Sequence, residues 1–431
     1  MRTKVSYPID DATIFKRRLL SWAQQYQEVT YLDSNGHTDP YGSFECLVAC
    51  EAESSLRCGF QAAFPKLKSY LDEVRDWVFG YCAYDLKNDI EALSSNGADG
   101  LGFADLYFFQ PKRIIRLNGN MAEYIYLDRY SEDIISDHAC ISSFLVPEDK
   151  PAQELSKIKM RIFKDAYFKK VQKFLQHIYR GDIYEANFCQ EFYSENTVID
   201  PLSVFFRLNE IARPPFGAYF KAGHLYALSS SPERFLKKTG TTLVSQPIKG
   251  TARRSTDPVI DRELKEVLAG DPKEKAENIM IVDLVRNDLS KHALKGSVKV
   301  KELCKVYSFI QVHQMISTVV AQVAEETHPV DIIKNAFPMG SMTGAPKLSA
   351  MRLIESLELT RRGLYSGAIG YFTPEKDFDF SVVIRSILYN EKKKYLSFSV
   401  GSAITAKALP DSEYEECLLK AKAMRSVLDE H

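Results

Sequence analysis

The chain has 431 residues, 45% apolar and 26% charged, the usual balance of a soluble protein with a large core. Its 56 basic and 57 acidic side chains nearly cancel, so the charge gives no reason to expect nucleic acid or an anionic membrane as a partner. No stretch of about 18 apolar residues suggests a membrane span, and no apolar segment behind the charged N-terminus suggests a signal peptide. We therefore expect a cytoplasmic protein whose eight scattered cysteines are reduced thiols.

The first 150 residues have the pattern of a β-rich domain. Segments 77–81 and 106–109 are rich in aromatic residues, which is typical of strands. Segment 31–34 predicts a strand that runs into Asn35-Gly36, a strong signal for a tight hairpin. The polar, proline-bracketed stretch 146–151 predicts a linker to a second domain over residues 151–431.

Helices and strands intermix in the second domain. Apolar spacing predicts a helix that ends near Gly181, and further helices over 272–289, 347–357 and 413–428. Strands are expected over these segments: 183–192, 225–230, 242–246, 367–372, 380–389 and 395–400. This mixture predicts an α+β fold.

One lysine lies between a proline, which restricts the backbone, and a glycine, which gives the backbone more freedom. In Pro247-Ile248-Lys249-Gly250-Thr251, Lys249 would project from a short, rigid turn after the strand at 242–246. Within a cleft, desolvation would lower its pKa towards that of a free, nucleophilic amine. The plainer interpretation of these five residues is a solvated lysine in a surface turn.

Two pairs of glutamates share one spacing. Glu274 and Glu277 lie three residues apart on one expected helix, and Glu413 and Glu416 lie three apart on the last helix. The spacing puts each pair on one helical face. Four carboxylates would suit Mg²⁺ if the two faces met, and otherwise they are two solvated faces.

Other residues could bind an anion or transfer a proton. Glu233, which follows Ser231-Pro232, could be a general acid or base if burial raises its pKa, or it could pair with an arginine. Arg385 could bind a carboxylate, and backbone N–H groups at Gly401-Ser402-Ala403 could do the same. The loop 340–347 lacks the spacing of a Walker nucleotide-binding motif.

Taken in order, the segments over residues 155–427 resemble the chorismate-utilising enzymes, the family of anthranilate synthase component I, isochorismate synthase and aminodeoxychorismate synthase component I. The matching segments are Gly181-Asp182-Ile183-Tyr184, Ser231-Pro232-Glu233-Arg234-Phe235, Pro247-Ile248-Lys249-Gly250-Thr251, 276–288, Thr343-Gly344-Ala345-Pro346-Lys347, 365–371 and Glu413-Tyr414-Glu415-Glu416. The resemblance implies a large mixed β-sheet or β-sandwich core with helices packed outside.

Lys249 favours one branch of this family. Anthranilate synthases usually carry alanine at its position, whereas aminodeoxychorismate synthases typically carry lysine. Isochorismate and salicylate synthases carry a water-activating lysine at the position of Glu185, so Glu185 argues against them, although glutamine is commoner there in the ammonia-using synthases. The resemblance thus implies amination of chorismate to 4-amino-4-deoxychorismate, in p-aminobenzoate and folate biosynthesis.

The resemblance also implies a role for each matching residue. Lys249 would attack C2 of chorismate, Glu233 would protonate the leaving C4 hydroxyl, and His313 would lie near that oxygen. Mg²⁺ would bind to Glu277 and Glu416, with Glu274 and Glu413 holding its waters. The implied substrate-binding residues are Arg385, Tyr365, Thr343, Gly401 and Ser402. No glutaminase triad is evident, so ammonia would come from a separate glutamine amidotransferase subunit.

Some positions depart from the family pattern. Ala403 stands where glycine is usual, and Arg352 stands where a glutamate is usual. Leu32-Asp33-Ser34 resembles a tryptophan-binding stretch of regulated relatives and equally fits a plain hairpin. Two alternative functions stay open, namely anthranilate synthase component I and a non-catalytic chorismate-binding homologue.

Overall fold

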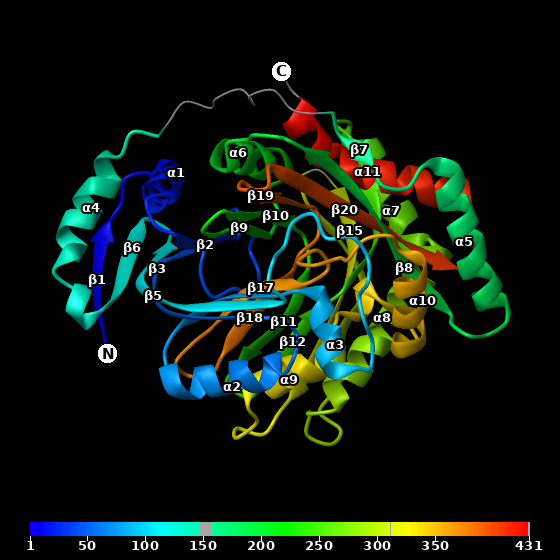
Figure 1. The fold of residues 1–431 in the computed structure, drawn as a ribbon, viewed down its shortest axis with the longest axis horizontal. Coiled ribbons are helices and arrows are strands. Elements are labelled where there is room, and N and C mark those ends of the chain that lie inside the picture. The colour runs from blue at the N-terminus through cyan, green and yellow to red at the C-terminus, as the bar shows by residue number, and fades with distance from the viewer. Residues whose placement is uncertain (147–156, 311, 430–431) are drawn as a thin grey trace.

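The computed structural model describes residues 1–146, 157–310 and 312–429, and the expected linker lies almost entirely outside them. Strands occupy the centre of the molecule, and most helices lie around them (Figure 1). The strands are β1 (Arg2–Pro8), β2 (Glu28–Asp33), β3 (Cys46–Cys58), β4 (Val78–Cys82), β5 (Leu106–Asn118), β6 (Met121–Leu127), β7 (Lys159–Met160), β8 (Glu185–Glu195), β9 (Phe216–Ala222), β10 (Leu225–Ser231), β11 (Arg234–Thr239), β12 (Thr242–Gln246), β13 (Ile248–Arg253), β14 (Lys299–Ser308), β15 (Val312–Gln322), β16 (Gly344–Ala345), β17 (Ala368–Phe372), β18 (Phe378–Val382), β19 (Ser386–Asn390) and β20 (Tyr395–Thr405). The helices are α1 (Ala12–Ala23), α2 (Ala63–Val74), α3 (Lys87–Ile90), α4 (Asp133–Ser143), α5 (Lys164–Tyr179), α6 (Pro201–Ala212), α7 (Pro258–Gly270), α8 (Pro272–Ser290), α9 (Pro329–Ala336), α10 (Lys347–Leu357) and α11 (Pro410–Asp429).

Two antiparallel sheets share the long strand β5. In the first sheet the order is β1-β6-β5-β3-β2-β9-β10-β19-β20-β8. In the second, β5 is followed by β4, β17, β18, β11, β12 and β15. The second half of β5 pairs with β6 and its first half with β4, so the two sheets diverge from this one strand.

Successive side chains of a strand alternate between two cores, as the pleat of a strand requires. In β2, Leu32 lies in the core between the sheets, and Tyr31 lies in the core beneath the outer helices. Strand β3 repeats this pattern with Leu47 and Val48. The outer core also contains Phe174 of α5 and residues of α1, α6 and α11. The expected α+β fold, a β-sandwich core with helices packed outside, is confirmed. Among the described residues the paired strands are antiparallel, whereas a mixed sheet would also contain parallel pairs.

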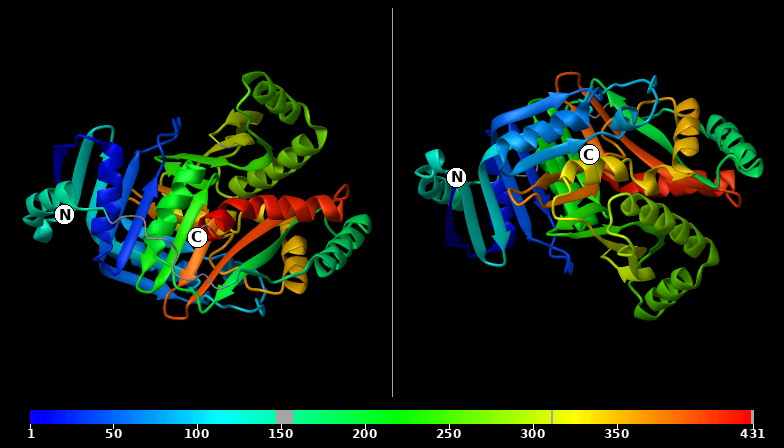
Figure 2. Two further views of the ribbon diagram at one scale, coloured as in Figure 1. Left: turned by 90° about the horizontal axis from the view of Figure 1, so that it is seen from above. Right: turned by 90° about the horizontal axis from the view of Figure 1, so that it is seen from below.

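The segment from α7 to β14, yellow-green in Figure 2, stands out from the sheets. Strands β13 and β14 pair with opposite edges of β15, and α7 and α8 pack against them. Because β15 also pairs with β12 of the second sheet, this projecting segment is attached directly to the sandwich. All eight cysteines are free thiols, as expected.

Several predicted elements are confirmed closely. Helix α10 and strand β12 have the predicted bounds, and α8 runs from Pro272 to Ser290, one residue beyond its predicted end. The N-cap explains where α8 begins, because the Asp271 side chain accepts hydrogen bonds from the first backbone N–H groups and Pro272 occupies the first turn.

Three predictions were wrong in detail. The strand expected over 380–389 is divided into β18 and β19, because Arg385 has a φ of 51° that interrupts the extended backbone. Strand β20 continues to Thr405, so Gly401 lies within it and not after it. Asn35 and Gly36 have the positive φ of a turn, but β3 begins only at Cys46, so the connection is longer than a tight hairpin.

The predicted division near residue 150 falls outside the described residues and stays a prediction. Strands on either side of it are hydrogen-bonded to one another, since β2 pairs with β9 and β4 pairs with β17. No helix in the described part of the chain has the length and apolar character needed to span a membrane.

Candidate active site

Lys249 lies in strand β13, not in the predicted turn. The pairing of β13 with β15 shifts register between Ile248 and Thr251, which marks a β-bulge around Lys249 and Gly250. Gly250 has a φ of +91°, a conformation that L side chains rarely adopt. A bulge redirects the side chains of a strand, and here Nζ of Lys249 reaches Oε1 of Glu185 at 2.9 Å.

The charge on Lys249 corrects the expectation of a free amine. Burial acts to lower its pKa, but the carboxylates of Glu185, Glu277 and Glu416 outweigh burial and hold the pKa above its usual value. Only 11% of the Lys249 side chain is exposed. The resting lysine is therefore an ammonium ion enclosed among carboxylates.

Glu233 has the environment that was predicted for a general acid. It follows β10, only 5% of the residue is exposed, and burial raises its pKa to about 7. The hydroxyl of Ser341 donates a 2.7 Å hydrogen bond to Oε1, and this bond with the charges of Lys249 and Arg385 limits the rise. Arg234, beside it, is fixed by Asp39 and Asp379 on the other side of the strand.

Arg385 and Tyr365 lie at two neighbouring backbone distortions. Arg385 has a φ of 51° and Ser366 a φ of 62°, and Ser366 N donates to the carbonyl of Val383. Burial lowers the pKa of the Arg385 guanidinium, and Glu233 opposes this. Within the described ranges the guanidinium has no ion-pair partner, so it is available for an anion. Backbone strain of this kind is concentrated at functional sites.

The remaining predicted substrate residues contribute in different ways. Thr343 is buried and bonds through its hydroxyl to the carbonyls of Met339 and Gly340, which leaves its hydroxyl engaged within the loop. Gly401 pairs with Cys189 in the sheet, and a Cβ there would lie 2.7 Å from the Cys189 sulfur. The hydroxyl of Ser402 contacts Tyr167 at 3.0 Å. A side chain at position 401 would therefore force the Cys189 and Asn187 side chains to move.

His313 lies on β15 and faces α7. Its Nδ1 contacts Oγ of Ser308 at 3.0 Å, and its Nε2 contacts Oδ1 of Asp261 at 3.1 Å. Both ring nitrogens are therefore engaged, and neither contacts Lys249 or Glu233. Its role near the C4 oxygen stays a prediction.

The two glutamate pairs do face one another across α8 and α11. Nζ of Lys273 lies 3.3 Å from Oε1 of Glu413 and 3.9 Å from Oε1 of Glu277, and so joins the helices. Burial raises the pKa of Glu274, and the charge of Glu416 raises it further. Burial likewise raises the pKa of Glu277 to about 7.

The carboxylates fit a divalent cation by their chemistry. Oε1 of Glu277 is buried without a hydrogen-bond partner, and the four carboxylates repel one another. In the described residues as they stand, no three His, Cys, Asp or Glu side chains gather closely enough to hold a metal ion. Lys273, Lys249 and Lys420 supply positive charge to the cluster instead.

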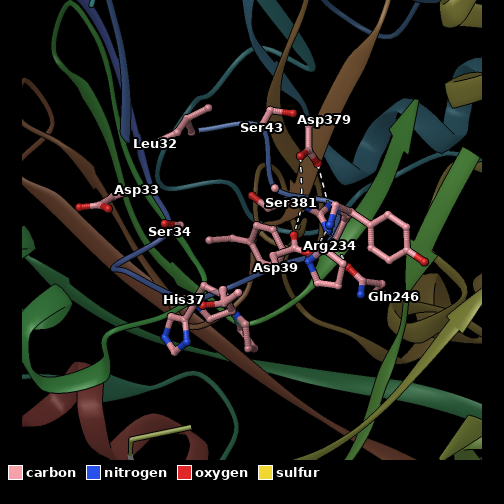
Figure 3. Close-up of a pocket in the computed structure, with 18 of the residues that line it drawn as sticks. Leu32, Asp33, Ser34, His37, Asp39, Ser43, Arg234, Gln246, Asp379 and Ser381 are labelled. Atoms are coloured by element: carbon pink, nitrogen blue, oxygen red, sulfur yellow. Dashed lines mark hydrogen bonds and ion pairs between the residues drawn. The ribbon is translucent and has the colours of Figure 1, made fainter. Parts of the chain in front are cut away.

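A cavity of about 910 Å³, part of whose lining is drawn in Figure 3, does not have Lys249 or Glu233 among its lining residues. It is lined by Ile248 and Arg234, the sequence neighbours of Lys249 and Glu233. Leu32, Asp33 and Ser34 also line it, so the stretch that resembles a tryptophan-binding segment does border a cavity. Whether tryptophan binds there stays a prediction.

Three contacts of the site were not foreseen from the sequence: Glu185 to Lys249, Ser341 to Glu233, and Lys273 to Glu413. From the sequence, Glu185 served only to argue against isochorismate and salicylate synthases and as a departure from the commoner glutamine. The one signal for the contact with Lys249 was that Glu185 carries a carboxylate where the family more often has the amide of glutamine. Arg352 is exposed on α10, and nothing in the structure explains its replacement of a glutamate.

The sequence profile of chorismate binding enzymes matches residues 25–426, and the chain belongs to this family. A curated relative from Streptomyces griseus, aminodeoxychorismate synthase, is 39% identical over 283 residues, which are 65% of this chain and 39% of that protein. Aminodeoxychorismate synthase component 1 of Salmonella typhimurium is 33% identical over 350 residues, or 81% of this chain and 76% of that one. Anthranilate synthase component 1 of Thermus thermophilus is 31% identical over 392 residues, or 88% and 83%.

The fold is also found in solved structures. Anthranilate synthase component I from Streptococcus pneumoniae superposes with a TM-score of 0.78 at 22% identity, covering 90% of this chain and 94% of that chain. This likeness confirms the architecture expected from the sequence.

Proposed function

We propose that this chain converts chorismate and ammonia to 4-amino-4-deoxychorismate, as the chorismate-binding component of an aminodeoxychorismate synthase. The observation that carries this proposal is Lys249, enclosed in the site where Glu233 and Arg385 also lie. An anthranilate synthase needs no lysine at this position. The names of the Streptomyces and Salmonella relatives support the same activity.

The chemistry proceeds by two displacements. Nζ of Lys249, as a free amine, bonds to C2 of chorismate, both ring double bonds shift by one position, and the C4–O bond breaks. Glu233, with a pKa of about 7, is protonated often enough at neutral pH to donate its proton, so that the hydroxyl leaves as water. Ammonia then bonds to C4, and the C2–N bond to Lys249 breaks.

The substrate is a dianion, and the site offers two places for carboxylates. Arg385 has a guanidinium without an ion-pair partner in the described chain, and its planar fork suits a carboxylate. Glu277 and Glu416, with Glu274 and Glu413, would hold Mg²⁺ near the other carboxylate. The ion would supply positive charge to the substrate there.

Ammonia would come from a separate glutamine amidotransferase subunit. The term component 1 in the name of the Salmonella relative supports a second subunit for that protein, and we extend it to this chain.

The experiment that tests the proposal is direct. The purified chain is incubated with chorismate, Mg²⁺ and an ammonium salt, and the product is identified by mass spectrometry. We expect 4-amino-4-deoxychorismate, which retains the enolpyruvyl group. Absence of any turnover would favour a non-catalytic chorismate-binding homologue.

A second candidate is anthranilate synthase component I. The Thermus relative favours it, since it aligns with 88% of this chain and 83% of its own length. That reaction releases pyruvate and yields a fluorescent aromatic amine. Fluorescence with release of pyruvate in the same incubation would establish this candidate and exclude the first.

A further inference from the structure

The strongest feature that the proposed function leaves without a role is the buried ion pair between Lys249 and Glu185. Their side chains meet at 2.9 Å, although the residues lie 64 positions apart on different strands. Only 1% of Glu185 is exposed, and its second oxygen, Oε2, is buried without a hydrogen-bond partner. A carboxylate so far removed from water is costly, which suggests that it serves a purpose beyond stability.

The backbone of Glu185 is fixed from both sides. It is the first residue of β8, where it pairs with Thr405 of β20 on one edge and with Ala345 of β16 on the other. Gly344 packs so closely that a Cβ there would lie 2.1 Å from the Glu185 carbonyl oxygen. The carboxylate therefore approaches Lys249 from a rigid position.

Other carboxylates face Lys249 from the surrounding elements. They are Glu274 and Glu277 of α8, Glu416 of α11, and Glu233 after β10. In the described chain, only Glu185 lies within 4 Å of Nζ as an ion-pair partner. Glu274, Glu277 and Glu416 are also committed to the proposed cation, and Glu233 must itself hold a proton for the leaving hydroxyl.

We propose that Glu185 is the group that accepts the proton of Lys249 and so releases it as a nucleophile. This role rests on the proposed function. The proton moves from Nζ to Oε1, which leaves a neutral amine beside a neutral carboxylic acid. The amine then bonds to C2 as Glu233 gives its proton to the departing hydroxyl.

The protons balance over the full cycle. Addition of ammonia at C4 breaks the C2–N bond and returns Lys249 as a neutral amine. Glu185 gives its proton back to that amine, and the ammonium group of the product returns one to Glu233. In the net reaction, chorismate and ammonia are consumed, and 4-amino-4-deoxychorismate and water are produced.

The matched substitution is Glu185→Gln, which keeps the shape of the side chain and removes its charge. Two quantities are measured, with Glu195→Gln at the exposed end of the same strand as the control. The first is acetylation of Lys249 by acetic anhydride without substrate, quantified by peptide mass spectrometry. The second is kcat for ammonia-dependent product formation.

We expect Glu185→Gln to acetylate several-fold faster at Lys249, because the carboxylate that holds the ammonium ion is gone. We expect its kcat to fall roughly 100-fold, the usual contribution of a general base. A more reactive lysine in a slower enzyme is the combination that a purely structural ion pair would not give. Glu185→Asp should change both quantities in the same directions by less, and it decides the matter if Glu185→Gln does not fold.

A kcat within threefold of the wild type, or unchanged acetylation of Lys249, would overturn the role of Glu185. Failure of the proposed function is recognised separately, because the wild-type chain would then also make no 4-amino-4-deoxychorismate.

Discussion

Glu233→Gln gives a quantitative test of the burial that suits Glu233 to its proposed role as general acid. In the folded protein the pKa of Glu233 is about 7, against 4.5 for the ordinary side chain. Between these two pH values the folded chain retains a proton that the unfolded chain releases. The stability that this proton contributes is fully present below about pH 4.5 and is lost as the pH rises through 7. At about 1.4 kcal/mol per pH unit, the loss is roughly 3 kcal/mol.

Glutamine carries no charge at any of these pH values, so the substitution removes this dependence. We expect Glu233→Gln and the wild type to have similar free energies of unfolding near pH 4.5. Near pH 8 the variant should be more stable by about 3 kcal/mol. Its turnover should fall roughly 10² to 10⁴-fold, since a carboxamide cannot protonate the leaving hydroxyl.

The assay is urea unfolding of both proteins at pH 5 and pH 8, followed by intrinsic fluorescence. The control is Glu325→Gln, which changes an exposed glutamate outside the site and should show no such difference. If the free-energy difference between Glu233→Gln and the wild type were the same at both pH values, Glu233 would not be a buried acid with a raised pKa.

Three further predictions concern the same site. Lys249→Ala and Lys249→Arg should both lose C4 amination, because alanine has no amine and the guanidinium of arginine stays protonated. If chromatography showed unchanged product formation by Lys249→Ala, the lysine would be only a binding residue. Glu277→Gln or Glu416→Gln should abolish Mg²⁺-dependent turnover with little change in the melting temperature. Excess chelator should stop turnover by the wild type, and full activity in chelator would remove the cation from the proposal. Ammonium salts should support turnover that rises with pH, because ammonia is the nucleophile, whereas glutamine should not; equal rates with glutamine would reveal an amidotransferase site in this chain.

The sequence predicted local structure well where caps and periodicity decide it. Helix α8 begins where Asp271 and Pro272 place its cap, so Glu274 and Glu277 were correctly set on one face. For Glu233 the sequence left open a general acid or an arginine pair, and the structure shows the burial that raises its pKa.

Sequence reasoning failed where distant strands decide the backbone. Lys249 was expected in a turn because proline and glycine flank it, but pairing with β15 makes it part of a bulged strand. The interruption at Arg385 and the extension of β20 past Gly401 also depend on neighbours in the sheet. The charge of Lys249 was misjudged for the same reason, since Glu185 comes from another strand.

The sharing of both sheets between the two halves of the chain has a consequence for synthesis on the ribosome. Thr30 of β2 pairs with Phe220, and Gly80 of β4 pairs with Gly370, separations of 190 and 290 residues. At roughly 5 to 20 residues per second, β4 waits about 15 to 60 s for β17 to be made. During that time its apolar edge is open to other nascent chains. Lower growth temperatures should therefore raise the yield of folded protein, and so should chaperones that bind unpaired strands.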